Sequence, residues 1–382
     1  MGIRVYALAG AAGSVRLWQQ QRRSYASLVV KAQFALVSDD QMVGVASPKP
    51  VRMHGLHHGQ NPARSLRQAA ENVPYKRRAD VTAVGHVYGN GKSRAEVRLR
   101  VIRGGHPILD KTVLATGQRP GQGEPEPFDS LPVVFEHARR TDENPQGRPA
   151  AKSPQLTPYP ATSLPGGFGP VSPFAASRRR LGSEHMRDAV DDVAVARLPD
   201  DFDGAYFQHA LPDQQVDRLF GDEWIVLAGW HRDRTHLASR LPSPRAEARL
   251  VALGPRGADL IGKPVFEYEG VPLAFDTLDI DADFDTVTAL YRGRVSIDDV
   301  LDVGALAELA FVASVTVEDE APAWPDPRAL PALLEEHGAG TAAVAQGPDP
   351  QATGTGPVAL VDVSGTTFSL SGEQREQIRA GG

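Results

Sequence analysis

The best candidates for chemistry are carboxylates gathered between residues 200 and 223. They are Asp200, Asp201, Asp203, Asp213, Asp222 and Glu223. Two converging carboxylates could catalyse glycoside hydrolysis, one as the acid and one as the base or nucleophile, or they could hold calcium or magnesium. However, Asp200 and Asp201 follow a proline and Asp222 follows a glycine, where turns and helix caps favour carboxylates. The spacing therefore favours a structural use over a catalytic one.

Other patterns that would support catalysis or cofactor binding are weak or missing. The glycine-rich run 166–169 is followed by Pro170, whereas a phosphate-binding loop continues with Lys and then Ser or Thr. His54, His57 and His58 could approach zinc, but the glycines around them disfavour the helix that this spacing needs. The sequence contains no Gly-x-Ser-x-Gly pattern and no cysteine. We therefore expect no cofactor, no metal site and no enzymatic activity.

The composition is that of a globular protein without a basic surplus. The 382 residues carry a formal net charge of −6, and 41% of them are hydrophobic. Nucleic acid and anionic membranes are therefore poor candidates for the main partner. No stretch is both long and apolar enough to span a bilayer, and the N-terminal residues make a poor signal peptide. We expect a soluble, cytoplasmic protein without membrane insertion.

Alternating side chains in the first half of the chain predict antiparallel strands. Tyr25–Leu36 is rich in β-branched and aromatic residues and predicts a strand. Asp80–Tyr88 and Arg94–Arg103 flank the turn Gly89–Lys92, and an Asn-Gly pair between two such runs predicts a β-hairpin. In Arg94–Arg103 charged residues alternate with apolar ones, so one face should be solvated and the other buried.

The second half of the chain repeats this pattern. Short strands are predicted at Glu223–Leu227 and Glu247–Leu253, and a second hairpin at Phe275–Ile280 with Thr286–Val295. Residues 120–173 are dense in Pro and Gly, and aromatic anchors there predict an irregular segment packed across the sheet. Those anchors are Phe128, Phe135, Tyr159 and Phe168. The predicted class is mainly β, with antiparallel, sandwich-like sheets, long irregular Pro/Gly-rich crossings and few short helices.

A change of composition near residue 318 divides the chain. Residues 1–317 are predicted to form the β-rich domain, as one large sandwich or two packed subdomains. Residues 318–382 are rich in Pro, Ala and Gly, which predicts a linker-like tail. Within this tail we expect a short helix at Leu330–His337, a strand at Val358–Val363 and a helical turn at Glu373–Arg379.

One stretch is more distinctive than these patterns. It reads LPDDFDGAYFQHALPDQQ from Leu198 to Gln215 and LFGDE from Leu219 to Glu223. We call residues 198–223 the signature segment. It strongly resembles the signature of a bacterial family of unknown biochemical function, which reads P-x-D-F-D-x-x-Y/F-F-N-x-A-P-P-D-Q and then G-D-E. Members of that family accompany PAAR-type spike tips and spike trimers of the type VI secretion system.

Further motifs extend the resemblance in the same order from about Ser27 to Val295. They are Leu28–Phe34, Pro74–Lys76 with Ala79–Val81, Pro127–Glu136, Asn144–Arg148, Gly166–Pro173, and Leu278–Asp281 with Tyr291–Gly293. The central crossing departs from the family pattern, because His137–Arg140 replaces Ala-Phe-Gly-Gly and Pro149 replaces a glycine. This departure favours a divergent partner.

The resemblance implies adaptor or chaperone work rather than chemistry. It implies that the chain binds a PAAR-like effector and helps to seat it on the spike protein of a type VI secretion system. The signature residues that could contact this partner are Asp201, Phe202, Asp203, Tyr206, Phe207, Pro212, Asp213, Gln214, Gly221, Asp222 and Glu223. The aromatic members suit core packing as well as partner contact, and core packing is the favoured interpretation.

Two other functions stay open at this point. A carboxylate-based, glycosidase-like hydrolase would need two carboxyl groups that converge in a cleft. Its candidates are Asp201 or Asp203, paired with Asp213 or Glu223. A β-sandwich carbohydrate-binding module would need aromatic rings on an exposed face, and Trp224 and Trp230 are the residues that test this idea.

Overall fold

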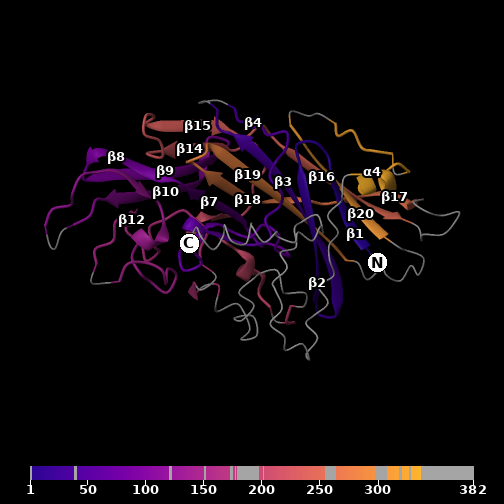
Figure 1. Cartoon of the computed structure of the whole chain (residues 1–382), viewed down its shortest axis with the longest axis horizontal. Coiled ribbons are helices and arrows are strands. Elements are labelled where there is room, and N and C mark those ends of the chain that lie inside the picture. Colours follow the sequence, from indigo (N-terminus) through magenta and orange to yellow (C-terminus); the bar gives the residue numbers. More distant parts are fainter. Residues whose placement is uncertain are drawn as a thin grey trace, which may run out of the picture.

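Strands dominate the structure, so the predicted mainly β class is confirmed. The architecture comes from a computed structural model. It describes residues 2–37, 41–119, 123–149, 152–172, 175–176, 178, 198–200, 202–253, 264–296, 308–317, 321–326 and 328–336. Three larger sheets follow one another along an elongated molecule (Figure 1). No helix in the described residues has the length and apolar character needed to cross a membrane.

A seven-stranded sheet occupies the middle of the molecule (Figure 1). Its strands are β2 (Ala12–Gln20), β3 (Arg23–Ala35), β4 (Val43–Gly44), β7 (Ala79–Val84), β13 (Gln215–Val216), β18 (Ala274–Asp281) and β19 (Thr286–Ser296). They lie in the order β13-β7-β18-β19-β3-β2, and β4 also pairs with β3. Strands β7 and β18 run parallel, whereas the other neighbours are antiparallel. The predicted strand Tyr25–Leu36 corresponds to β3, and the second predicted hairpin is confirmed as β18–β19.

A five-stranded antiparallel sheet forms one end of the molecule (Figure 1). Its strands are β9 (Arg94–Arg103), β10 (His106–Thr116), β12 (Leu156–Tyr159), β14 (Trp224–Ala228) and β15 (His236–Arg240), in the order β12-β10-β9-β14-β15. The predicted alternation on β9 is confirmed. Val97, Leu99 and Val101 are buried, and the charged side chains between them are exposed or half-buried. One face of this sheet therefore belongs to the core and the other to the surface.

The predicted hairpin around Asn90 and Gly91 is wrong. The turn lies within β8 (His86–Lys92), which pairs with β11 (Phe128–Pro132), whereas β9 pairs with β10 and β14. Asn90 and Gly91 do have the positive φ angles, 49° and 79°, that an Asn-Gly turn favours. The chain nevertheless leaves one sheet for another at this turn. The hairpin partner of β9 is β10, beyond Gly104 and Gly105, and the sequence patterns did not predict that strand.

A four-stranded sheet forms the other end of the molecule (Figure 1). Its order is β1 (Gly2–Ala7), β20 (Glu308–Thr316), β16 (Arg245–Leu253) and β17 (Pro264–Val271). Helix α4 (Leu330–Glu336) confirms the predicted short helix, and its residues Leu330 and Leu334 pack with Val251 and Val312. A small sheet joins β5 (Leu56–His57) to β6 (Leu66–Gln68). The predicted elements at Val358–Val363 and Glu373–Arg379 fall outside the described residues.

One hydrophobic core is shared by the three larger sheets. It contains Leu28 of β3, Leu99 of β9 and Phe311 of β20, all fully buried. Two of the predicted aromatic anchors are confirmed by burial, Phe135 at 5% and Phe168 at 0% exposure, and Phe128 packs at the margin of the core. The prediction is wrong for Tyr159, which is 63% exposed. Residues 123–149 and 152–172 are therefore held to the sheets by these rings, and also by the pairing of β11 with β8 and of β12 with β10.

Replacing Gly229 with alanine should destabilise the protein by about 2–3 kcal/mol, because the loop between β14 and β15 depends on this glycine. Its φ is +78°, and an added Cβ would lie 2.1 Å from the backbone oxygen of Glu96. Gly91→Ala is the matched control, since its φ is +79° but nothing lies within 4 Å of the added Cβ. That change should cost about 1 kcal/mol. Urea unfolding of both variants measures the difference, and equal losses would contradict the close approach.

Candidate functional site

The face of the seven-stranded sheet opposite the core carries the buried charged side chains of Arg16, Lys31 and Arg292, and other parts of the chain lie on it. Residues 50–76 cross this face as the first crossing, and the signature segment crosses beside it. Arg16 Nη1 donates to the carbonyl of Asn72 at 2.8 Å, and Arg292 Nη1 donates to the carbonyl of Val73 at 2.8 Å. Backbone N–H and C=O groups outside helices and strands have no regular hydrogen-bond partner, so they need other partners when they are buried. Side chains of the sheet supply them here.

Buried ion pairs fix the first crossing. The carboxylate of Glu71, 1% exposed, lies 2.9 Å from Lys31 Nζ and 2.7 Å from Arg52 Nη1. On the same face Asp276 pairs with Arg292 at 2.8 Å. Burial lowers the pKa of Lys31, although Glu71 opposes that shift. Removing one member of such a set leaves an uncompensated buried charge, so these groups stabilise the crossing as a unit.

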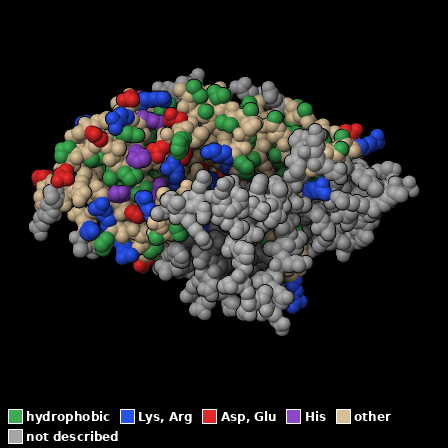
Figure 2. Space-filling model, viewed as in Figure 1, with side chains coloured by type: hydrophobic (Ala, Val, Ile, Leu, Met, Phe, Trp, Pro, Cys, Tyr) green, Lys and Arg blue, Asp and Glu red, His purple; other side chains and the backbone are tan. Residues whose placement is uncertain are grey.

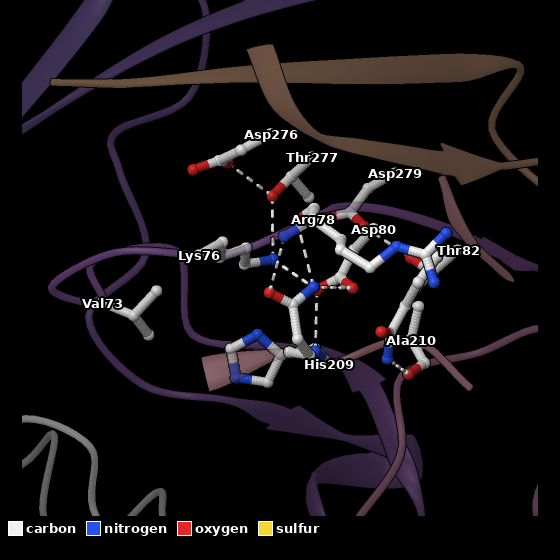
Figure 3. Close-up of polar contacts among 12 residues, drawn as sticks. Val73, Lys76, Arg78, Asp80, Thr82, His209, Ala210, Asp276, Thr277 and Asp279 are labelled. Atoms are coloured by element: carbon white, nitrogen blue, oxygen red, sulfur yellow. Dashed lines mark hydrogen bonds and ion pairs between the residues drawn. The ribbon is translucent and has the colours of Figure 1, made fainter. Parts of the chain in front are cut away.

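The signature segment is bound to the sheet at Asp80 of β7 (Figure 3). This carboxylate is fully buried. It accepts hydrogen bonds from Lys76 Nζ at 2.6 Å, Gln208 Nε2 at 2.8 Å and the backbone N–H of His209 at 2.7 Å. Lys76 Nζ also donates to the hydroxyl of Thr277 on β18 at 2.8 Å. We call this set the Asp80 node.

Electrostatics at the Asp80 node favour the ionised carboxylate. Burial raises the pKa of Asp80, but the charge of Lys76 and the hydrogen bonds outweigh burial and hold the pKa below its ordinary value. The neighbouring Asp279, to which the hydroxyl of Thr82 donates, behaves in the opposite way, since burial raises its pKa. Figure 3 shows that these groups come from β7, β18 and the two crossings. The node therefore joins segments that are distant in sequence.

Gln208 also attaches the signature segment to the chain before β7, because its side-chain amide forms hydrogen bonds with backbone groups there. Its Oε1 accepts from the backbone N–H of Arg77 at 2.9 Å, and its Nε2 donates to the carbonyl of Arg78 at 3.0 Å. One amide side chain thus pairs with two backbone groups just before β7. The same Nε2 also contacts Asp80.

Three aromatic residues of the signature segment, Phe202, Tyr206 and Phe207, pack together beside this node. The cluster contains Trp18, Val73, Leu198, Phe202, Tyr206 and Phe207, with Tyr25 and Tyr75 at its margin. Phe207 is fully buried, and its ring centroid lies 5.2 Å from that of Phe202 and 5.6 Å from that of Tyr75. These distances are typical of stabilising ring pairs. The three signature rings, Phe202, Tyr206 and Phe207, are therefore core residues.

Asp203 and Gly204 set the local geometry that brings these rings together. Gly204–Phe207 is a 3-10 turn, and the carboxylate of Asp203 caps it by accepting from the N–H of Ala205 at 2.9 Å. Asp203 also pairs with Arg77 at 2.6 Å. A Cβ at residue 204 would lie 2.0 Å from the ring of Tyr75, so the sequence places glycine there. The cap was expected at Asp200 or Asp201 instead; Asp200 accepts from the backbone N–H of Gln21 at 3.2 Å, and Asp201 lies outside the described residues.

Gln214 is a second buried attachment point. It ends the 3-10 turn Pro212–Gln214, is fully buried, and donates from Nε2 to the carbonyls of Val81 at 2.9 Å and Phe168 at 2.8 Å. Its Oε1 accepts from Lys111 Nζ of β10 at 2.8 Å. Gln214 therefore connects the signature segment, the seven-stranded sheet and the five-stranded sheet.

Lys111 should make the protein more stable as the pH rises from about 8 to 10.5. Burial lowers its pKa to about 8 in the folded chain, although Asp213 at 3.0 Å opposes the shift. The unfolded chain therefore binds more protons in this window, so the free energy of unfolding rises with pH. Urea unfolding across the window should show wild type gaining about 1–3 kcal/mol relative to Lys111→Met. A constant difference between the two proteins would contradict the lowered pKa.

The last signature residues close a turn at the start of β14. The carboxylate of Glu223 is fully buried and accepts from the N–H groups of Phe220 and Gly221, each at 2.7 Å. Burial raises the pKa of Glu223, and these hydrogen bonds oppose the shift. Gly221 has a φ of 94°, and Asp222 lies 3.4 Å from Arg103 of β9. This turn belongs to the five-stranded sheet rather than to the Asp80 node.

The predicted site residues are divided among several structural positions. The aromatic members share one cluster, Asp213 and Gln214 meet Lys111, and Gly221, Asp222 and Glu223 form the turn before β14. Asp201 lies outside the described residues. Among the described residues, no group of three or more His, Asp or Glu side chains is arranged to hold a metal ion. The other hydrolase candidates contact separate groups, Arg77 for Asp203, Lys111 for Asp213 and backbone N–H groups for Glu223.

Trp224, the first residue of β14, and Trp230, just after this strand, differ in their exposure. Trp224 is 37% exposed, whereas Trp230 is 1% exposed. The indole of Trp230 donates to the carbonyl of Arg98 at 2.9 Å, and its ring centroid lies 5.1 Å from that of Phe168. Trp230 is therefore a core residue, and the two rings do not form one exposed platform for carbohydrate.

Sequence reasoning missed several members of the site. Lys111 and Thr277 were not identified, and Gln208, Lys76 and Asp80 were noted only as parts of motifs. For Lys76 and Asp80, the sequence signal that could have indicated an ion pair is the four-residue spacing between a lysine and an aspartate. For Lys111 the signal is a cation in the apolar phase of a strand, between Leu109 and Val113.

Comparison with known families matches residues 21–292, a span that includes the first crossing, the Asp80 node and the signature segment. The matching family is described as "Uncharacterized protein conserved in bacteria (DUF2169)". No curated protein and no solved structure matches the chain. The matched span is close to the region from about Ser27 to Val295 over which the motif order was recognised.

Proposed function

The chain belongs to the uncharacterized bacterial family DUF2169, and on that premise we propose that it is a non-enzymatic adaptor. In this proposal it binds a PAAR-like effector in the cytoplasm and helps to load it onto the spike of a type VI secretion system. The connection to the spike rests on the resemblance of the ordered sequence motifs. The family description itself names no activity and no partner.

The use of the signature residues supports a binding role. Their polar atoms complete hydrogen bonds that fix irregular chain to the sheets, as at Gln208, Gln214 and Glu223. A catalytic acid or base must instead reach a substrate. The arrangement fixes the crossings to the seven-stranded sheet, while one face of β9 in the five-stranded sheet keeps exposed charged side chains that a partner protein could contact.

A capture assay tests this proposal. The tagged full-length chain is co-expressed with each PAAR-like and spike protein encoded beside it, and complexes are isolated by affinity and size-exclusion chromatography. We expect a stable complex with the effector, and spike loading that depends on the adaptor. If no neighbouring product is captured, and the purified chain hydrolyses a glycan or ester in a manner lost in Asp213→Asn, the hydrolase replaces the adaptor as the function.

A further inference from the structure

A groove of about 560 Å³ lies at the end of the five-stranded sheet where β14 turns into β15. It is lined by residues of β8, by the start of β9 and by the loop 229–235. Half-buried Ala95, Leu114 and Ala228 give part of the lining an apolar character. Figure 2 shows charged side chains of both signs spread over this end of the molecule.

Hydrogen bonds hold the loop 229–235 against β8, so the walls of the groove are fixed. The backbone N–H of Tyr88 donates to the carbonyl of Gly229 at 3.4 Å. The side chain of Asn90 donates from Nδ2 to the carbonyl of Arg232 at 3.3 Å. The left-handed conformation and close packing of Gly229 place the loop there. A groove built in this way needs little reordering to bind a ligand.

The groove is basic, although the protein as a whole has a net charge of −6. Its lining carries four cations, Lys92, Arg94, Arg232 and Arg234, against the carboxylates Glu96 and Asp233. These four cations are exposed, and within the described part of the chain none of them forms an ion pair. Arg232 lies 5.7 Å from the ring centroid of Tyr88. The groove therefore offers cations to an anionic ligand, beside apolar surface.

We propose that this groove binds an acidic polypeptide segment in which carboxylate side chains alternate with small apolar ones. This inference rests on the proposed function in assigning the segment to the effector or spike partner. Arginine side chains bind carboxylates with two parallel hydrogen bonds, and Ala95, Leu114 and Tyr88 suit apolar side chains between them. Nucleic acid is disfavoured, because Glu96 and Asp233 would face a continuous line of phosphates. A peptide can place neutral residues opposite these two carboxylates.

The test measures binding of a fluorescent peptide of repeating Glu-Val-Glu-Gly to the full-length chain by fluorescence anisotropy. We expect this peptide to bind, the same peptide with Gln in place of Glu to bind weakly, and oligothymidylate to bind less well than the acidic peptide. The double variant Arg94→Glu with Arg232→Glu should weaken peptide binding at least about tenfold. The matched control, Arg23→Glu with Lys49→Glu, reverses two exposed cations outside the groove and should bind as wild type does.

Several results would overturn the groove assignment. They are absence of peptide binding, equal binding by the Arg94→Glu/Arg232→Glu variant, equal binding of the Gln peptide, and tighter binding of oligothymidylate. The capture assay separates this inference from the proposed function. If wild type captures a neighbouring protein and the groove variant captures it equally well, the groove is not the docking site and the adaptor function stands. If the wild-type protein captures no neighbouring protein, the adaptor function fails. The peptide measurement alone then decides whether the groove binds an acidic polypeptide segment.

Discussion

Replacing Asp80 with alanine should lower the free energy of unfolding by about 3–5 kcal/mol. The carboxylate is fully buried and accepts from Lys76, Gln208 and the N–H of His209. Its removal leaves the ammonium of Lys76 buried beside the hydroxyl of Thr277 and takes the acceptor from two further donors. Urea unfolding measures the loss. Amide hydrogen exchange at residue 209 should also accelerate, because the signature segment loses its attachment.

Asp217→Ala is the control for this change. Asp217 also pairs with a cation, Arg78 at 2.9 Å, but its side chain is 96% exposed. Exposed pairs contribute little, so this variant should stay within about 0.5 kcal/mol of wild type. A loss for Asp80→Ala that is no larger than the loss for Asp217→Ala would contradict the anchoring role of the Asp80 node.

The stabilisation by Asp80 should disappear in acid. The pKa of Asp80 lies below its ordinary value of 3.8 in the folded chain. A carboxylate with a lowered pKa contributes stability above its unfolded pKa and loses it as the pH falls through the folded pKa. The difference between wild type and Asp80→Ala should therefore be constant at neutral pH and shrink below about 3.8.

The sequence predicts strands best where one face is solvated. On β9, charged residues alternate with Val97, Leu99 and Val101, and burial follows that alternation. On β10, Lys111 stands in the apolar phase, so the local pattern is broken. Its position is stabilised by Gln214, which lies 103 residues further along the chain. No local pattern reports a contact of that range, and β10 was missed for this reason.

Turn chemistry predicts the local path of the chain but not the sheet that follows. Asn90 and Gly91 adopt the predicted conformation, yet β8 pairs with β11 rather than with β9. The signature segment shows the same limit. Its resemblance identified a group of residues, but the partners that give them their roles, such as Asp80 and Lys111, come from strands elsewhere in the chain. Pairing of this kind is decided by tertiary packing.

Phe207→Ala should destabilise the protein by about 3–5 kcal/mol, because it removes a fully buried ring from the aromatic cluster. The neighbouring rings of Phe202, Tyr206 and Tyr75 lose their contacts with it and cannot collapse into the space while the Asp80 node holds the segment. Thermal and urea unfolding measure the effect. Phe207→Leu, which keeps most of the volume, should cost clearly less than Phe207→Ala.

Phe220→Ala is the matched control, since this ring also belongs to the signature segment but is 46% exposed. Its main described contact is the guanidinium of Arg103, 3.2 Å from the ring centroid, so its loss should cost about 1 kcal/mol or less. In the capture assay, variants at positions 207 and 220 distinguish an effect on core packing from an effect on partner contact. Phe207→Leu should fold and still capture the partner, because a buried ring acts only through the fold. Loss of capture by a fully folded Phe207→Leu protein would instead place that ring at the binding surface.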